Sequence, residues 1–186
     1  VCWASRNAVK DWPLRLLDLG TGSGCLLSAL MCELPKAQGI GIDINPDALA
    51  MARRNVASLG LGDRAAFAEH SFTDDLGSLG DFDVILSNPP YIPTGEIDGL
   101  AVDVKSFDPA LALDGGADGM TCWTQLLPRL AAVLAVDGMA FVEIGRGQEN
   151  AVTAVAEKVN LRLRDSHCVL AGITRCLAFS IKTCNG

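Results

Sequence analysis

Short apolar runs alternate with segments of helical periodicity along most of this 186-residue chain. The apolar runs predict strands at residues 15–19, 38–43, 65–68, 83–87, 139–144, 161–164 and 176–181. Apolar residues at helical spacing predict helices at residues 25–34, 46–59, 122–135 and 149–159. Such alternation predicts an α/β domain built on a mainly parallel sheet with helices on both faces.

Between residues 91 and 119 the chain has no regular pattern and is rich in Gly, Asp and Pro. A loop of this length inside a compact domain is usually functional or disordered. We interpret it as a substrate-facing loop, with a disordered insertion as the alternative.

The composition is that of an ordered globular protein, with 49% apolar and 20% charged residues. No apolar run reaches the ~18 residues of a membrane-spanning helix, and the first residues lack the layout of a signal peptide. We therefore expect one domain over residues 1–186 and no membrane association. Because the chain starts without Met, we expect it to be a fragment.

The net charge of −7 gives the chain no general attraction for nucleic-acid phosphates, which favour clustered Lys and Arg. The seven Cys are odd in number and include no Cys-x-x-Cys pair, which favours reduced thiols in the cytoplasm. The only histidines, His70 and His167, belong to no Cys/His cluster of metal-site spacing, so no metal is predicted.

A glycine-rich sequence, Asp-Leu-Gly-Thr-Gly-Ser-Gly, joins the first predicted strand to the first helix at residues 18–24. Glycines at such a junction let the backbone approach a ligand above a helix N-terminus. A dinucleotide fingerprint fails because Cys25 or Leu27 occupies its third glycine position, and a P-loop fails because no Gly-Lys-Ser/Thr follows. With Asp18 beside it, the turn suits a smaller, cationic nucleoside.

Asp43 ends the second predicted strand. A carboxylate there can accept hydrogen bonds from both ribose hydroxyls of a nucleotide. The alternative is that Asp43 caps the helix that begins near Pro46, although Asn45 is better placed as a cap. We favour ribose binding because the glycine turn lies nearby in the predicted fold.

Asn-Pro-Pro-Tyr follows the fourth predicted strand at residues 88–91, and these four residues are called the tetrad below. The two prolines make a stiff segment without N–H donors, while their carbonyls remain free to accept hydrogen bonds. Asn88 adds a side-chain carbonyl, and Tyr91 adds an aromatic face. The tetrad therefore suits the binding of a planar –NH2 group, although Asn-Pro also marks ordinary turns.

Together, the glycine turn, the strand-end Asp43 and the tetrad resemble the class I S-adenosylmethionine-dependent methyltransferases. Further segments are similar to the release factor glutamine methyltransferases of the HemK type: Asn-Pro-Pro-Tyr-Ile-Pro at 88–93, Phe-Asp-Pro at 107–109, Ala-Leu-Asp-Gly-Gly at 112–116 and Asp-Gly at 118–119. Glu-Ile-Gly at 143–145 and Gln148 also match that family. The chain departs from it at His70 and Val169, where the family commonly has Asp.

The resemblance implies a Rossmann-like, seven-stranded class I methyltransferase domain without the N-terminal helical domain of family members. It implies S-adenosyl-L-methionine as cofactor, S-adenosyl-L-homocysteine as product, and a peptide chain release factor as protein substrate in the cytoplasm. Cofactor binding is assigned to residues that follow the first four strands: Asp18, Gly20, Thr21, Gly22, Gly24, Asp43, Ile44, Phe72 and Asn88. Substrate binding is assigned to Asn88, Pro89, Pro90, Tyr91, Asp108 and Pro109, and catalysis to Asn88, Pro89 and Tyr91.

The implied reaction is methyl transfer to a glutamine side-chain amide. Such a nitrogen is a poor nucleophile because its lone pair is delocalised into the carbonyl. Accepting both of its N–H bonds, at the Asn88 side-chain oxygen and the Pro89 carbonyl, would orient it and stabilise the charge that develops there. Tyr91 would form a wall of the pocket.

Four alternatives stay open at this point. An adenine N6-methyltransferase shares the tetrad, but the net charge and the Ala-Leu-Asp-Gly-Gly segment argue against it. A ribosomal-protein glutamine methyltransferase is closer and harder to exclude. A non-catalytic cofactor-binding subunit is disfavoured by the intact tetrad, and an α/β domain that binds some other nucleotide is the least specific alternative.

Overall fold

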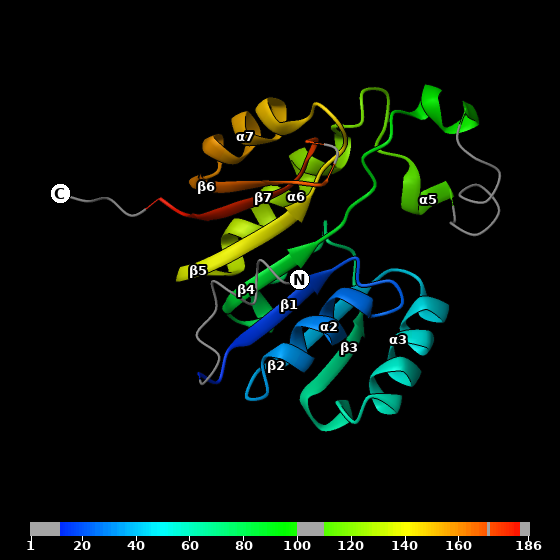
Figure 1. Ribbon diagram of the computed structural model, residues 1–186, viewed down its shortest axis with the longest axis vertical. Helices are drawn as coiled ribbons and strands as arrows, with labels where there is room; N and C mark the ends of the chain where they lie inside the picture. The colour runs from blue at the N-terminus through cyan, green and yellow to red at the C-terminus, as the bar shows by residue number, and fades with distance from the viewer. Residues whose placement is uncertain (1–11, 100–109, 171, 183–186) are drawn as a thin grey trace.

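A computed structural model of the chain describes residues 12–99, 110–170 and 172–182, and these form one sheet with helices on both sides (Figure 1). The strands are β1 (Arg15–Leu19), β2 (Gln38–Asp43), β3 (Ala65–Glu69), β4 (Phe82–Ser87), β5 (Leu134–Glu143), β6 (Leu161–Cys168) and β7 (Thr174–Ile181). The α-helices are α2 (Cys25–Glu33), α3 (Pro46–Ser58), α5 (Ala110–Leu113), α6 (Thr121–Val133) and α7 (Glu149–Lys158). Short 3₁₀ helices lie at η1 (Gly62–Arg64), η2 (Gly77–Leu79) and η3 (Thr94–Gly99).

The strand order is β3-β2-β1-β4-β5-β7-β6. All neighbouring pairs from β3 to β5 are parallel, and β7 runs antiparallel to both β5 and β6. From β1 the chain proceeds outward to β2 and β3, then returns to β4 on the other side of β1. In open α/β sheets, ligands bind at such a reversal, outside the carboxyl ends of the strands. The predicted mainly parallel, seven-stranded sheet is confirmed.

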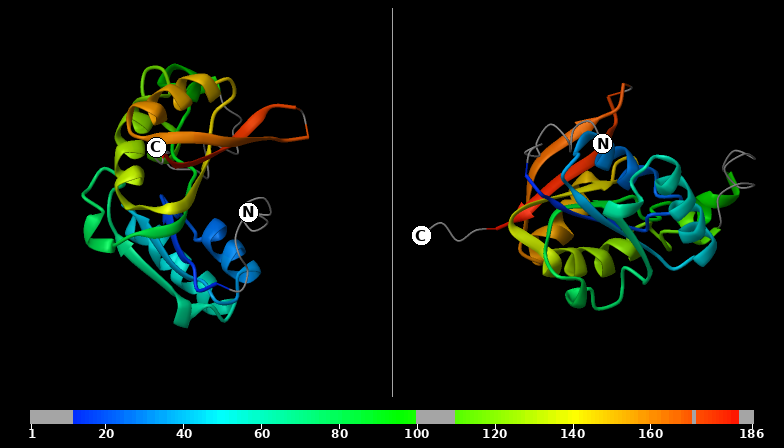
Figure 2. Two further views of the ribbon diagram at one scale, coloured as in Figure 1. Left: turned by 90° about the vertical axis from the view of Figure 1, so that its left-hand side faces the viewer. Right: turned by 90° about the horizontal axis from the view of Figure 1, so that it is seen from below.

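Each face of the sheet has its own apolar core. One core packs Leu27, Leu30 and Met31 of α2 against the sheet together with Val56 of α3. The other packs buried residues of α6 and α7, among them the fully buried Trp123, against the opposite face. The turned views show these two helical layers on opposite sides of the curved sheet (Figure 2). The helices therefore lie on both faces of the sheet, as predicted, and the sheet is packed between two apolar cores.

The largest corrections to the predicted boundaries lie in the C-terminal half. The helix predicted to end at residue 135 ends at Val133, and the strand predicted from residue 139 begins at Leu134, which pairs with Phe82. Strand β6 was predicted to end at residue 164 but continues to Cys168, and Cys168 pairs with Thr174 of β7. Backbone pairing in the β6–β7 hairpin extends these strands beyond their apolar pattern, and the hairpin projects past the rest of the sheet (Figure 2).

The stretch after the tetrad also contains more regular structure than its sequence predicts. Within the described residues it contains η3 and α5, and Ile92 forms a parallel bridge with Asp114. Ile92 N–H donates to the Leu113 carbonyl at 3.0 Å, and Gly115 N–H donates to the Ile92 carbonyl at 2.8 Å. The two ends of this long loop are therefore joined directly to each other.

Candidate active site

The glycine turn (residues 20–24) and the tetrad lie side by side because they follow adjacent strands. Leu19 at the end of β1 is paired with Ser87 at the end of β4, and the Ser87 hydroxyl donates to the Leu19 carbonyl at 2.9 Å. Both loops thus begin at the topological switch point of the sheet (Figure 1). The fold brings the two strongest sequence motifs to one place.

Left-handed backbone at three positions shapes the glycine turn. The φ angles are +72° at Gly20, +54° at Gly22 and +76° at Gly24, a region that favours glycine. A Cβ at Gly24 would lie 3.0 Å from the Ala52 Cβ, so this glycine also lets α2 approach α3. A Cβ at Gly20 or Gly22 would meet no atom within 4 Å, so the outer surface of the turn is open to a ligand.

Asp18 lies beneath this turn and is 1% exposed. The Thr21 hydroxyl donates to its Oδ2 at 2.7 Å, whereas its Oδ1 has no hydrogen-bond partner in the described part of the chain. Burial raises the pKa of the carboxyl from 3.8 to about 6, and the bond from Thr21 opposes that shift only in part. At neutral pH the turn therefore covers a buried negative charge that has no cationic partner among the described residues.

This buried carboxyl predicts a distinct pH dependence of stability. A raised folded-state pKa means that the stabilisation is complete below pH 3.8 and is lost as the pH rises through about 6. Raising the pKa from 3.8 to about 6 corresponds to about 3 kcal/mol of unfolding free energy. Urea unfolding of Asp18→Asn between pH 4 and 8 should lack this decrease. The exposed-site control Asp63→Asn should keep it, and parallel curves for the two variants would contradict the assignment.

Asp43 at the end of β2 uses both carboxylate oxygens within the protein. Its Oδ2 accepts from Gly22 N–H at 2.8 Å, and its Oδ1 accepts from Asn45 N–H at 2.9 Å. The cap of α3 is Asn45, whose side chain accepts from Asp47 and Ala48 N–H. Asp43 is therefore no helix cap, and it fixes the glycine turn to the loop after β2. Each oxygen retains a lone pair for a further donor.

Ile44 and Phe72 flank this part of the sheet edge. Ile44 follows Asp43 and is 47% exposed, whereas Phe72 follows β3 and packs partly against the core. His70 N–H donates to the Asp43 carbonyl at 3.2 Å, which keeps the segment after β3 beside the end of β2. Both residues thus follow strands that end at the same edge of the sheet as β1, and their contact with a cofactor stays a prediction.

The tetrad presents its acceptors unequally. The Cys122 thiol donates to the Pro90 carbonyl at 2.7 Å, and Gln148 Nε2 donates to the Tyr91 carbonyl at 3.0 Å. No described residue donates to the Pro89 carbonyl or bonds the Asn88 side chain, which is exposed. The two acceptors that the sequence singled out, the Asn88 side-chain oxygen and the Pro89 carbonyl, therefore have no donor among the described residues.

Several segments surround Tyr91, the only tyrosine in the chain. Its hydroxyl donates to Glu143 Oε1 at 3.1 Å, and the Arg175 guanidinium lies 5.9 Å from the centre of its ring. Burial raises the pKa of Tyr91, and the nearby Glu143 carboxylate raises it further. The ring is consequently a neutral, fixed wall beside the free acceptors.

The Gly-Gly and Asp-Gly segment packs directly on the backbone of Tyr91. A Cβ at Gly115 would lie 2.9 Å from the Tyr91 Cα, and one at Gly119 would collide with the Tyr91 carbonyl oxygen. Residues 112–119 therefore pack against the tetrad at the backbone of Tyr91. Asp108 and Pro109, predicted to bind substrate, lie outside the described residues.

Sequence patterns missed Cys122, Arg175 and the contacts of Gln148 as parts of the site. Gln148 and Arg175 only match family segments, which assign them no role, and Cys122 carries no motif of its own. Cys122 and Gln148 are separated from their tetrad partners by 32 and 57 residues. Only the packing of α6 and the start of α7 against the tetrad reveals them.

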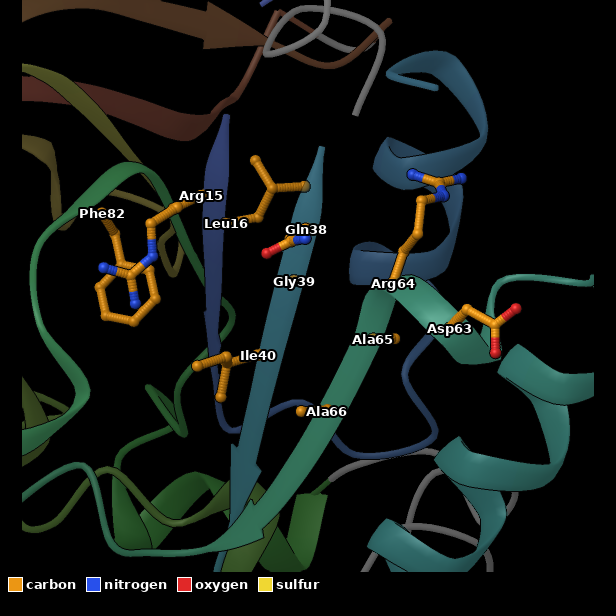
Figure 3. Close-up of a pocket in the computed structure, with 10 residues that line it drawn as sticks. All are labelled: Arg15, Leu16, Gln38, Gly39, Ile40, Asp63, Arg64, Ala65, Ala66 and Phe82. Atoms are coloured by element: carbon orange, nitrogen blue, oxygen red, sulfur yellow. The ribbon is translucent and has the colours of Figure 1, made fainter. Parts of the chain in front are cut away.

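A separate hollow of about 260 Å³ lies at the opposite edge of the sheet, where β1, β2 and β3 begin (Figure 3). Its two arginines are engaged in structural contacts. Arg15 donates to the Leu79 carbonyl and lies over the Phe82 ring, and Arg64 donates to the Leu34 and Ala37 carbonyls. This hollow has no connection with the predicted chemistry.

No group of three or more His, Cys, Asp or Glu side chains within residues 12–99, 110–170 and 172–182 could hold a metal ion. Among the helices of this same part of the chain, none has the length and apolar character needed to cross a membrane.

Comparison with known protein families agrees with this architecture. A family model described as a methyltransferase domain matches residues 11–134. The ribosomal protein L11 methylase of Lactobacillus delbrueckii subsp. bulgaricus superposes with a TM-score of 0.69 at 21% identity, over 98% of this chain and 76% of that one. TrmN of Thermus thermophilus superposes with a TM-score of 0.66 at 19% identity, over 96% and 47%. At these identities the structures share the fold, that of class I methyltransferases.

Relatives found by sequence are more similar to this chain than these solved structures are. The release factor glutamine methyltransferase of Rhodospirillum rubrum is 46% identical over 163 residues, which cover 88% of this chain and 50% of the relative. That of Caulobacter vibrioides is 49% identical over 140 residues, covering 75% and 48%. The chain thus spans about half the length of these curated relatives. The family model, the sheet order and the motifs at the switch point together show that this chain belongs to the methyltransferase domain family.

Proposed function

We propose that residues 1–186 are the catalytic domain of an enzyme that methylates the side-chain amide nitrogen of a glutamine in a protein. The methyl donor is S-adenosyl-L-methionine, and the acceptor is the glutamine of the Gly-Gly-Gln motif of a peptide chain release factor. The single observation that carries the proposal is the pair of free acceptors, the Asn88 side chain and the Pro89 carbonyl. Their neighbours in the tetrad are already bonded by Cys122 and Gln148.

The residues around the glycine turn fit the proposed cofactor. S-adenosylmethionine carries positive charge, and the unpartnered Oδ1 of buried Asp18 supplies negative charge beneath the turn. The open surface at Gly20 and Gly22 admits a ligand close to the backbone. Asp43 retains acceptor capacity for ribose hydroxyls beside that surface. Thr21 and Gly24 shape the turn, and we place the adenine between Ile44 and Phe72.

The tetrad acts on the acceptor amide. One amide N–H donates to Asn88 Oδ1 and the other to the Pro89 carbonyl, which orients the nitrogen towards the glycine turn. Fixed acceptors at the position where positive charge develops stabilise the transition state, because they need no reorganisation during the reaction. Bound S-adenosylmethionine would supply the sulfonium methyl group for the new N–C bond and leave as S-adenosylhomocysteine. The methylated nitrogen then releases a proton to solvent, so no general base is required.

Pro90 and Tyr91 complete the binding site for the glutamine. Pro90 contributes rigidity, since it lacks a backbone N–H and has a restricted φ. Tyr91 lines the side of the amide, and its bond to Glu143 fixes the ring. Aligning two bound reactants can contribute ~7–11 kcal/mol towards the barrier. We also place Asp108 and Pro109 in the binding of substrate segments next to the glutamine.

The choice of release factor over other glutamine proteins comes from the relatives. Proteins at 46% and 49% identity are named release factor glutamine methyltransferases. Five described cysteines are free, which agrees with a reducing, cytoplasmic location. A net charge of −7 gives no general affinity for DNA or RNA.

A comparison of acceptors tests this function. The chain is incubated with methyl-labelled S-adenosylmethionine and one of three acceptors: a release factor, a ribosomal protein or adenine-containing DNA. We expect label only in the release factor, with the mass of one added methyl group on its Gly-Gly-Gln peptide. A release factor in which that glutamine is replaced by alanine serves as the matched control. Equal labelling of the control, or labelling of DNA alone, would refute the proposal.

A further inference from the structure

Three consecutive carbonyls in the tetrad differ in their surroundings. The Pro90 carbonyl accepts a hydrogen bond from Cys122 of α6. The Tyr91 carbonyl accepts one from Gln148, the residue that precedes α7. The Pro89 carbonyl has no donor among the described residues. The direction of the free carbonyl is therefore set by the two bonds that fix its successors.

Gln148 uses every part of its side-chain amide. Its Oε1 accepts from Gly145 N–H at 2.9 Å, which determines the orientation of the amide. Its Nε2 then donates to both the Tyr91 carbonyl at 3.0 Å and the Gly119 carbonyl at 3.1 Å. One side chain thus joins the loop after β5, the tetrad and the segment at residues 112–119.

Two glycines provide the space that this amide needs. A Cβ at Gly119 would lie 2.7 Å from Gln148 Nε2, and a Cβ at Gly145 would lie 2.9 Å from Gln148 Oε1. A side chain at either position would displace the amide from its partners. The space left by Gly119 and Gly145 thus fits the Gln148 amide closely. This close packing supports the placement of Gln148 independently of its hydrogen bonds.

Cys122 provides the second support. It is 5% exposed, and its thiol donates to the Pro90 carbonyl. Burial raises the pKa of this thiol to about 12, so it stays protonated and remains a donor at neutral pH. The neighbouring Trp123 is fully buried in the core, which fixes this turn of α6.

We infer that Gln148, assisted by Cys122, is a positioning residue for methyl transfer: it holds the Tyr91 and Pro90 end of the tetrad so that the Pro89 carbonyl and Asn88 face the acceptor amide. This inference rests on the proposed function. Neither residue touches the reacting atoms, so cofactor affinity should not depend on them. A misplacement of about 1 Å in an active site can lower the rate about 100-fold.

Gln148→Leu tests this role because it keeps most of the side-chain volume and removes all three hydrogen bonds. We expect single-turnover methyl transfer to fall about 10- to 100-fold, while the cofactor Kd measured by calorimetry stays the same. Gln148→Glu keeps the acceptor for Gly145 and replaces the donor by an oxygen, so it should be impaired to a similar degree. Gln125→Leu, on an exposed face of α6, is the matched control and should behave as the parent.

Tyr91 also gives a readout that does not require activity. Because it is the only tyrosine, protein labelled with 3-fluorotyrosine has one ¹⁹F resonance, which reports on the tetrad. Gln148→Leu should shift or split this resonance, and Gln125→Leu should not. Cys122→Ala should lower the methyl-transfer rate, and Cys122→Ser, which keeps a donor, should recover part of it.

The outcomes separate this inference from the function on which it rests. An unchanged fluorotyrosine resonance in Gln148→Leu refutes the positioning role whether or not the parent methylates glutamine. If the parent is active, a parent-like transfer rate of Gln148→Leu also refutes the positioning role. A loss of cofactor affinity in Gln148→Leu equal to its loss of transfer rate refutes it as well. A parent that binds cofactor and methylates none of the acceptors refutes the proposed function, while the ¹⁹F comparison still tests Gln148.

Discussion

Replacing Asn88 by alanine is expected to lower methyl transfer about 10²–10³-fold, the usual cost of removing one preorganised hydrogen-bond partner of a transition state. Asn88 is exposed at the end of β4, and its side chain bonds none of the described residues, so the fold does not depend on it. The change removes one of two free acceptors for the amide. Single-turnover transfer with labelled cofactor measures the rate.

The same variant should bind S-adenosylmethionine with nearly the parent Kd in calorimetry, although Asn88 was also assigned a cofactor contact. The glycine turn and Asp43 supply the principal proposed contacts and are untouched by this change. Asn150→Ala, an exposed substitution in α7, is the matched control for both measurements. If cofactor affinity falls as far as the transfer rate, the assignment of Asn88 to the acceptor amide is wrong.

Replacing Asp43 by alanine should weaken cofactor binding about 100-fold. The carboxylate accepts from Gly22 N–H and Asn45 N–H, so its removal releases both the glycine turn and the loop after β2. Hydrogen bonds to a charged group contribute about 1.5–3 kcal/mol each, and a loss of about 3 kcal/mol corresponds to that change in Kd. Calorimetric titration with S-adenosylhomocysteine, the proposed product, measures the effect without turnover.

Two further variants define what Asp43 contributes. Asp43→Asn keeps one acceptor oxygen but loses the charge, so its Kd should lie between those of the parent and Asp43→Ala. Asp137→Ala removes an exposed carboxylate from β5 and should leave the Kd unchanged. Parent-like affinity of Asp43→Ala would show that neither the turn nor the ribose depends on this residue.

The sequence predicted the first half of the fold more closely than the second. The bounds of β1 and β2 are as predicted, because the glycine turn ends β1 and the Asn45 helix cap closely follows β2. In the second half, β5 begins five residues before the predicted start, and β6 extends past its prediction. Pairing with β4 lengthens β5, and pairing with β7 lengthens β6. The local apolar pattern does not indicate such pairing.

The candidate site divides in a similar way. The residue types in the glycine turn, Asp43 and the tetrad could be recognised because each follows a predicted strand and has chemistry that can be named locally. The sequence also suggested Asp43 as a ribose ligand, but the structure adds that it fixes the glycine turn through Gly22. The stretch at residues 91–119 was interpreted as substrate-facing, and the structure adds that its end, at Gly115 and Gly119, packs against Tyr91.

By itself, the sequence determined the class of fold, the order of strands and helices along the chain, and the groups able to bind a cofactor and a planar amide. Those properties depend on residue type and short-range spacing. The tertiary structure decided that Leu19 and Ser87 bring the two motifs together, and that Cys122 and Gln148 occupy two of the tetrad carbonyls. Which acceptors remain free depends on hydrogen bonds between residues far apart in the chain, and such bonds exist only once the sheet and its helices have packed.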